Sequence, residues 1–177
     1  MKKDILKIIL DIIKNVDQDR HPGLYGARSY SHGREGEKSF IYASDGFRAL
    51  KIECGGDLCF LPLNDDIFIP GEKLKEEYKK MAKNDIYSFT GAIKESGEGF
   101  IKDGVKYAFD TPDYNELFKS FEGLEPDGFG CFDLSFLKDL ASLGRQKIEI
   151  FKTSPKSHVL KISGEGFEYI QMGICEK

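Results

Sequence analysis

The sequence has few residues of the kinds that bind metals or form disulfides. It contains four cysteines and three histidines among 177 residues. No two cysteines form a C-x-x-C pair, and the histidines are scattered along the chain. We therefore expect no metal site and no cofactor, and reduced cysteines in a cytoplasmic protein are the default expectation.

A long uninterrupted apolar run is also missing. The N-terminal stretch MKKDILKIILDIIKN opens with lysines and then turns apolar, as a targeting segment would. Asp4, Asp11 and Lys14 interrupt it, it is too short to span a bilayer, and no small-residue cleavage site follows. We interpret this stretch as a helix of the core.

Motifs typical of catalytic sites do not occur. The sequence has no G-x-x-x-x-G-K-S/T, no G-x-S-x-G and no H-E-x-x-H. The sequence SGEGF, at 96–100 and again at 163–167, is typical of hairpin turns, not of a phosphate-binding loop. Aspartates that could be imagined as metal ligands lie in turns, where aspartate is common. We therefore predict that the protein is not an enzyme.

The overall composition is that of an ordinary globular protein. Charged residues make up 32% and aromatic residues 12% of a chain long enough for one domain or two small ones. The formal charge of −4 argues against a protein that coats nucleic acid with its whole surface. It leaves a local basic face open.

Residues 40–52, FIYASDGFRALKI, are the stretch around which the remaining patterns are arranged. β-Branched and aromatic residues lead into Asp45 and Gly46, a pair that supplies the positive φ of a two-residue hairpin. Apolar residues then lead away from the turn. Taken alone, the pattern predicts a hairpin and nothing more.

Periodicity predicts two helices and several strands before residue 125. The helices cover residues 4–17 and 72–83, and residues 115–122 form a helical turn or an irregular loop. We expect strands, besides the hairpin, at 24–30, 57–63, 67–69, 86–93, 99–102 and 105–109. Residues 125–128 are typical of a linker, and beyond it we expect a strand at 129–132, a helix at 134–143, a strand at 147–151 and a hairpin of 158–162 with 167–174.

A weak internal repeat supports this interpretation. An offset of 129 − 67 = 62 residues aligns Leu74 with Phe136 and Tyr78 with Leu140, without a gap. Strand, helix and strand recur in that order. Repeated βαβββ units of this size predict an α+β fold with helices on one face of antiparallel sheets, although many unrelated strand–helix–strand units would superpose as well.

Four short motifs resemble the bacterial DNA polymerase sliding clamp (β clamp) family in the family's own order. ASDGFRAL resembles A-T-D-G-H-R-L, and Ile67-Phe68-Ile69-Pro70 resembles V-I-V-P. Thr111-Pro112-Asp113-Tyr114 resembles F-P-D-Y, and residues 169–173, YIQMG, resemble Y-V-x-M-P. The resemblance implies that residues 1–124 correspond to the second clamp domain and residues 125–177 to the end of the third, with the first domain and the first half of the third absent.

The same resemblance implies a peptide-binding pocket between those two parts. An extended peptide would need an apolar slot for Leu or Phe anchors and a few fixed polar edges. The implied wall residues are Ser44, Gly46, Arg48, Pro112, Leu117, Ile170, Met172 and Ile174. Departures from the family pattern, such as Phe47 in place of His, imply a changed or lost peptide preference. A C-terminal strand packed into the sheet would equally explain Ile170, Met172 and Ile174.

Lysines on the outward helix faces suggest a second interaction. Basic helix faces on an acidic protein would suit sequence-independent contact with the phosphates of duplex DNA. The candidate DNA-facing residues are Lys3, Lys7, Lys14, Lys79, Lys80, Lys83, Lys138 and Arg145. Lysines that merely solvate exposed helix faces are the alternative.

Three functions from different classes follow. The first is a non-catalytic sliding-clamp-like protein that forms a homo-oligomer and tethers or recruits DNA replication or repair proteins through the pocket, with or without encircling DNA. Its partners would be double-stranded DNA and the clamp-binding peptides of polymerases or loaders. The second is a clamp-derived interaction module that binds a partner peptide and never touches DNA. The third is an unrelated α+β domain with a small-ligand or enzymatic role.

Overall fold

The structure is a computed structural model of the 177-residue chain. It describes residues 1–29, 39–54, 67–87, 93–94, 100–102, 105–107, 113–126, 131–133, 135, 137–138, 140–143, 146–154 and 157–173. The elements in chain order are α1 (Lys3–Ile13), β1 (Gly26–Ser29), β2 (Ser39–Ser44), β3 (Arg48–Cys54), β4 (Ile67–Pro70), α2 (Gly71–Lys80), β5 (Ile93–Lys94), β6 (Phe100–Lys102), β7 (Val105–Tyr107), α3 (Tyr114–Lys119), the 3-10 helix η3 (Leu140–Leu143), β8 (Gln146–Ser154), β9 (Ser157–Gly164) and β10 (Phe167–Met172).

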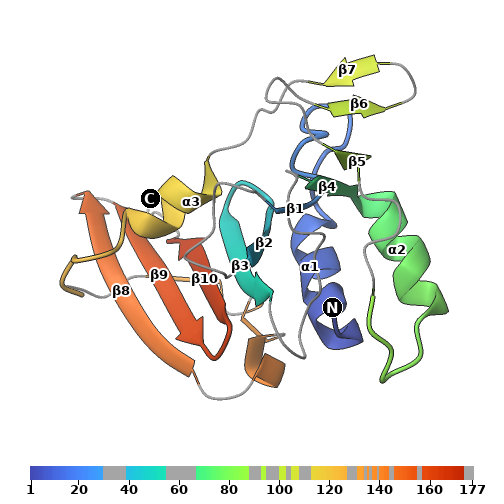
Figure 1. Ribbon diagram of the computed structural model, residues 1–177. Helices are drawn as coiled ribbons and strands as arrows, with labels where there is room; N and C mark the ends of the chain where they lie inside the picture. The colour runs from blue at the N-terminus through green and yellow to red at the C-terminus, as the bar shows by residue number, and fades with distance from the viewer. Residues whose placement is uncertain are drawn as a thin grey trace.

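One antiparallel sheet organises these elements. Its eight strands lie in the order β5-β4-β1-β2-β3-β10-β9-β8, and β6 and β7 pair separately (Figure 1). The central junction is the pairing of β3 with β10, in which Leu50 lies opposite Tyr169 and Ala49 opposite Ile170. Strands from both predicted parts, 1–124 and 125–177, thus share one sheet, while the division into two domains stays a prediction.

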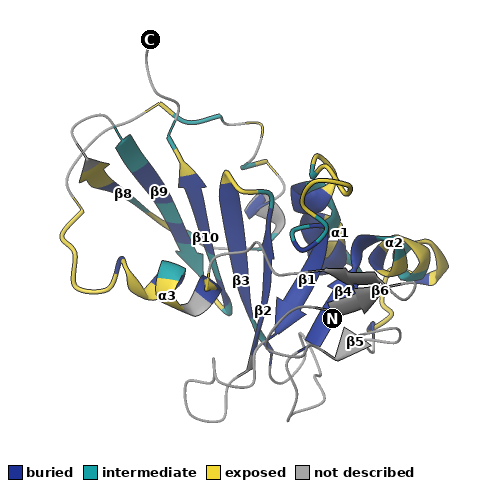
Figure 2. Ribbon diagram, turned by 90° about the horizontal axis from the view of Figure 1, so that it is seen from above, coloured by how far each residue is buried: buried dark blue, intermediate teal, exposed yellow. Residues whose placement is uncertain are grey.

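The two long helices lie side by side on one face of this sheet (Figures 1 and 2). The apolar stripe of α1 is buried because Ile5, Ile9 and Ile12 recur at helical spacing and face the strands. Leu74 of α2 and alternate residues of the strands, such as Leu50, complete the larger hydrophobic cluster. The predicted α+β arrangement of antiparallel strands with helices on one face is confirmed for these two helices.

The short helix α3 covers the opposite face of the sheet. The ring of Tyr114 stacks on that of Tyr42, with centroids 5.6 Å apart and planes at 8°. Phe118 also contacts Tyr42, and Phe121 contacts Phe151 of β8. The sequence was compatible with either a helical turn or an irregular loop at 115–122. The structure forms the helix, because these aromatic side chains fill a second hydrophobic cluster against the sheet.

The prediction of an α-helix at 134–143 is wrong for the residues that the structure describes. There the described residues are in 3-10 helix or turn, and the amide of Leu140 donates to the carbonyl of Leu137 (3.0 Å), an i to i−3 bond. The amide of Ser135 donates to the Asp133 carboxylate (2.9 Å), a local turn at the start of this segment. The 62-residue repeat therefore fails at its helix.

Several strand predictions also need correction or lie outside the described residues. Residues 131–133 form no strand, and Ile86 forms only an isolated bridge with Lys2. The strand β8 is longer than predicted, running from Gln146 to Ser154. The predicted strand at 57–63 lies outside the described residues, as do residues 88–92 of the strand expected at 86–93.

Two buried tyrosines make the free energy of unfolding depend on pH in the alkaline range. Burial raises the pKa of Tyr87 to about 12 and raises the pKa of Tyr169 further above its ordinary value. Because the folded state holds these protons more tightly than the unfolded chain, this contribution to stability is complete below pH 10. It is lost as the pH rises through about 12.

We expect the free energy of unfolding, measured with urea by circular dichroism, to fall as the pH rises above about 10. The Tyr87→Phe variant has no such proton to release, so its stability should fall less steeply over the same range. Parallel curves for the two proteins would contradict the assignment to Tyr87.

Candidate functional site

The turn between β2 and β3 is held by its own side chains. Asp45, Gly46 and Phe47 connect the strands, and Gly46 has a φ of 91°, which favours glycine. The Asp45 carboxylate accepts hydrogen bonds from the amides of Phe47 (3.0 Å) and Arg48 (3.1 Å). The Ser44 hydroxyl donates to the Arg48 carbonyl (2.8 Å) and accepts from the Gly46 amide (3.1 Å). The turn is one residue longer than the predicted two-residue hairpin, because Phe47 also precedes β3.

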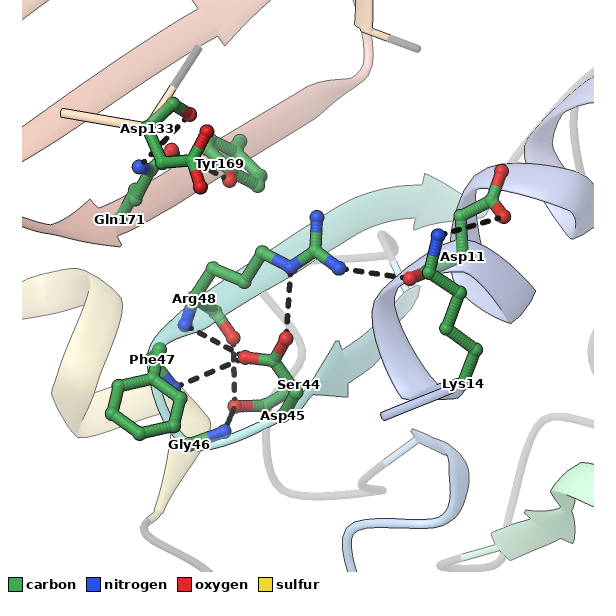
Figure 3. Close-up of polar contacts among 10 residues, drawn as sticks. All are labelled: Asp11, Lys14, Ser44, Asp45, Gly46, Phe47, Arg48, Asp133, Tyr169 and Gln171. Carbon is green, nitrogen blue, oxygen red and sulfur yellow. Dashed lines mark hydrogen bonds and ion pairs between the residues drawn. The ribbon is translucent and has the colours of Figure 1, made fainter. Parts of the chain in front are cut away.

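Arg48 ties this turn to helix α1 (Figure 3). Its Nε donates to Oδ2 of Asp45 (2.9 Å), and its Nη2 donates to the main-chain carbonyl of Asp11 (2.8 Å). The side chains of Arg48 and Asp45 are only 5% and 6% exposed. A buried ion pair with these additional hydrogen bonds is costly to break, so it fixes the turn relative to the helix.

A second polar group lies beside Arg48 on β10 and on the segment that precedes η3 (Figure 3). The Tyr169 hydroxyl donates to Oε1 of Gln171 (3.0 Å), and Nε2 of Gln171 donates to the Asp133 carbonyl (3.3 Å). Burial raises the pKa of Tyr169, and the Arg48 charge partly opposes that shift. These contacts hold β10 on the face of the sheet that packs against α1, where Tyr169 belongs to the larger hydrophobic cluster.

A pocket of 730 Å³ opens between the turn, α3 and the ends of β9 and β10. Most of its surface area is apolar, although eight of its lining residues have polar side chains. The apolar lining residues are Val16, Leu24, Phe47, Ala49, Leu117, Phe121, Val159, Ile170 and Met172. The polar ones are Asn15, Asp17, His21, Ser44, Asp45, Arg48, Thr153 and Gln171. A mostly apolar concavity with few polar groups is typical of sites for apolar ligands or peptide side chains.

The exposed apolar residues of the pocket are Phe47 and Met172. Their exposed fractions are 70% and 53%, although large apolar side chains are usually buried. The amide of Met172 donates to the carbonyl of Phe47 (2.9 Å), so the end of β10 is attached directly to the hairpin turn. The two side chains therefore belong to one continuous rim.

The comparisons with known proteins found similarity in structure but not in sequence. No family model matches the chain, and no curated protein matches it. The DNA polymerase III subunit β of Borrelia burgdorferi, solved in complex with a natural product, superposes with a TM-score of 0.57 at 14% identity, over 100% of this chain and 62% of that one. The Helicobacter pylori β clamp bound to a DNA ligase peptide superposes with a TM-score of 0.54 at 14% identity, over 98% of this chain and 63% of that one. A candidate DNA polymerase III β subunit of Eubacterium rectale superposes with a TM-score of 0.56 at 13% identity, over 98% of this chain and 64% of that one.

The chain has the fold of a bacterial sliding clamp. The resemblance inferred from the sequence motifs is confirmed at the level of fold. The chain spans 62–64% of the length of those three structures.

The clamp-like chain brings most of the predicted pocket residues together. Ser44, Gly46, Arg48, Leu117, Ile170 and Met172 all line the pocket. Pro112 and Ile174 lie outside the described residues. Ile170 is at once a buried strand residue and part of the lining, so the two interpretations of the C-terminal strand are compatible. Peptide binding by these residues stays a prediction.

Other lining residues were not predicted from the sequence. Leu24 and His21 come from the segment between α1 and β1, Val159 from β9, and Phe121 from the turn that follows α3. No short motif marks them, because each contributes only one side chain from a distant part of the chain. The aromatic character of residues 118–121 was the one available signal.

The predicted DNA-facing lysines of the clamp-like fold divide into two groups. Lys3 donates to the Met81 carbonyl and lies over the Tyr78 ring, 4.9 Å from its centroid, so it links α1 to α2. Further ion pairs join Lys7 and Lys14 to Asp11 (2.9 and 3.7 Å), and Lys80 to Glu77 (3.0 Å). The second group is exposed and forms no ion pair with any described residue: Lys79, Lys83 and Lys138. Arg145 lies outside the described residues.

The described part of the chain holds neither a cluster of metal ligands nor a helix that could span a membrane. No group of three or more His, Cys, Asp or Glu side chains there could hold a metal ion. None of its helices is long and apolar enough to cross a membrane.

The buried pair of Arg48 and Asp45 should matter far more than an exposed pair of the same length. We expect Arg48→Met to lower the free energy of unfolding by about 3 kcal/mol or more, because it leaves the buried Asp45 charge without its partner. The matched control is Lys7→Met, which removes the exposed Lys7–Asp11 pair, also 2.9 Å long. We expect it to cost about 0.5 kcal/mol or less.

Denaturant titration followed by circular dichroism measures both values. The double variant Asp45→Asn with Arg48→Met removes both charges and should recover part of the loss. Equal effects of Arg48→Met and Lys7→Met would show that the turn does not depend on the buried pair.

Proposed function

We propose that this chain is a non-catalytic, sliding-clamp-like protein that captures an extended peptide of a partner in the pocket beside the β2–β3 turn. The observation that carries the proposal is the convergence of Ser44, Arg48, Leu117, Ile170 and Met172, five residues of the described lining, on one concavity. They come from the ends of β2 and β3 that flank the turn, from α3 and from β10, far apart in the sequence. The pocket is therefore a product of the fold.

The lining of the pocket suits a peptide that inserts an apolar side chain and is aligned by polar contacts. Leu117, Val159 and Ile170 offer an apolar surface for a Leu or Phe side chain of the peptide. The exposed rim residues Phe47 and Met172 would contact the next apolar residue. The buried Asp45–Arg48 pair holds the turn in one conformation, so little ordering would be required on binding.

A similar structure supports the class of partner. The Helicobacter pylori β clamp was solved bound to a DNA ligase peptide. By analogy, we propose that the partners here are proteins of DNA replication or repair, such as polymerases or loaders, in the cytoplasm, and that the chain self-associates as a homo-oligomer. The exposed Phe47, in place of the family's His, would give this pocket its own peptide preference.

Peptide binding is tested with a fluorescently labelled DNA ligase peptide of the kind bound by the Helicobacter clamp. We expect Met172→Glu to weaken binding at least roughly tenfold, because a carboxylate would replace an apolar contact at the rim. The matched control is Leu124→Glu. Leu124 is 50% exposed, like Met172 at 53%, but does not line the pocket.

Fluorescence polarisation measures both affinities, and a peptide with its large apolar residues replaced by alanine should not bind. Equal losses in the two variants would indicate a nonspecific effect and contradict the proposed site. Binding that survives Met172→Glu would contradict it as well.

Contact with DNA is a second candidate function, favoured by the exposed lysines beside α2. Of the predicted DNA-facing residues, Lys79 and Lys83 are the exposed ones on or next to this helix that form no ion pair with a described residue. They would contact phosphates without reading sequence. The paired lysines contribute less, since Asp11 and Glu77 neutralise them.

A salt titration of binding to duplex DNA tests this role. We expect the double variant Lys79→Glu with Lys83→Glu to reduce the slope of log affinity against log salt by roughly 1.8, at about 0.9 for each phosphate that is no longer neutralised. The control is Lys119→Glu with Lys152→Glu, exposed lysines of α3 and β8. An unchanged slope, or an equal change in the control, would favour the interaction module that does not touch DNA.

A further inference from the structure

Strand β8 forms one edge of the eight-stranded sheet. It is 9 residues long, and its inner side pairs with β9 along most of its length. Among the residues that the structure describes, no strand pairs with its outer side. The regular pairing ends at a register shift between Lys152 and Ser154, so the segment from Gln146 to Lys152 pairs with β9 in one unbroken register. Such an edge presents main-chain donors and acceptors to another strand.

The side chains of this segment are unusual for an edge strand. Ile148 is 60% exposed, although most isoleucines of the described chain are buried. Lys147 is 72% exposed and forms an ion pair with Glu149 of the same strand (2.8 Å). Protected edges usually carry charges that repel a second strand. Here the two charges have opposite sign and flank an exposed apolar residue, and the Glu149 side chain is 17% exposed.

We propose that β8 pairs antiparallel with β8 of a second copy of this chain, about a two-fold axis at Ile148. In this register Lys147 of each copy lies opposite Glu149 of the other, and the two Ile148 side chains face each other. Gln146 lies opposite Ile150 at both ends. The same surface serves in both copies, as a two-fold interface requires.

The neighbouring registers place identical charges, or a charged and an apolar side chain, opposite each other across the interface. Since a strand places alternate residues on opposite faces, a symmetric antiparallel pair must be centred on a residue. An axis at Lys147 or at Glu149 would place that charge opposite its own copy. An axis at Ile150 would leave Glu149 opposite Phe151 and Ile148 opposite Lys152. Of these four registers, the one at Ile148 pairs both charges.

This interface lies apart from the peptide pocket. The segment 146–150 contributes no residue to the pocket lining, which takes only Thr153 from β8. The inference rests on the self-association in the proposed function and is independent of peptide binding. The dimer would extend the sheet across the two copies and leave both pockets available.

The mass of the full chain in solution, measured by light scattering and sedimentation across a concentration series, tests the interface. We expect a dimer of twice 20.0 kDa. Lys147→Glu alone should raise the dimer dissociation constant roughly tenfold or more, because it places glutamate opposite Glu149 twice in each dimer. Glu149→Lys alone should do the same, because it places lysine opposite Lys147.

Mixing the two variants should restore a dimer, because each copy then supplies the charge that the other lacks at both positions. The matched control is Lys119→Glu, which makes the same charge change on α3 and should leave the dissociation constant within about twofold. Lys147 is highly exposed, so Lys147→Glu should keep the wild-type unfolding curve, and it remains informative if Glu149→Lys fails to fold.

Each other result contradicts a specific claim. A monomer at every concentration would overturn both the β8 interface and self-association, while a peptide titration would still report on the pocket. A dimer that neither charge variant weakens would overturn the β8 interface and leave self-association by another surface. Weakening by both variants without restoration on mixing would overturn the register centred on Ile148.

Discussion

The pairing of β3 with β10 is the interaction on which the rest of this structure depends. It joins a hairpin near the N-terminus to a hairpin at the other end of the described chain, with Leu50 opposite Tyr169 and Ala49 opposite Ile170. Because strand residues alternate between faces, this register sends Tyr169 into the cluster beneath α1 and Ile170 toward α3. A slip of one residue would exchange the two faces and destroy both clusters.

The same junction creates the pocket. Its wall needs the β2–β3 turn and the end of β10 side by side, and the bond from the Met172 amide to the Phe47 carbonyl holds them there. The buried Arg48 then connects the turn to α1 through the Asp11 carbonyl. The polar contacts of Figure 3 therefore hold in place the turn and the strand beside a mostly apolar pocket. A mostly apolar concavity suits the proposed extended peptide.

The two long helices contribute less to recognition than their lysines suggest. Lys3 spans from α1 to α2, and Lys7 pairs with Asp11 on its own helix, so these charges are largely used within the chain. Exposed ion pairs of this kind add little stability, but they lower the local positive potential. On the edge strand β8 the proposed dimer would use the opposite charges of Lys147 and Glu149 between two copies of the chain.

Local patterns in the sequence were sufficient for the helix α1, for the turn at Asp45 and Gly46, and for most strands, because those signals lie within a few residues of each other. The fold family followed from short motifs, and so did six of the residues that line the pocket: Ser44, Gly46, Arg48, Leu117, Ile170 and Met172. Tertiary structure alone decided that α3 forms a helix against Tyr42, that 134–143 forms no full α-helix in its described part, and that Leu24 and Val159 share one pocket. The physical reason is distance along the chain: packing and sheet register join residues more than a hundred positions apart, and no local propensity encodes which of them will meet.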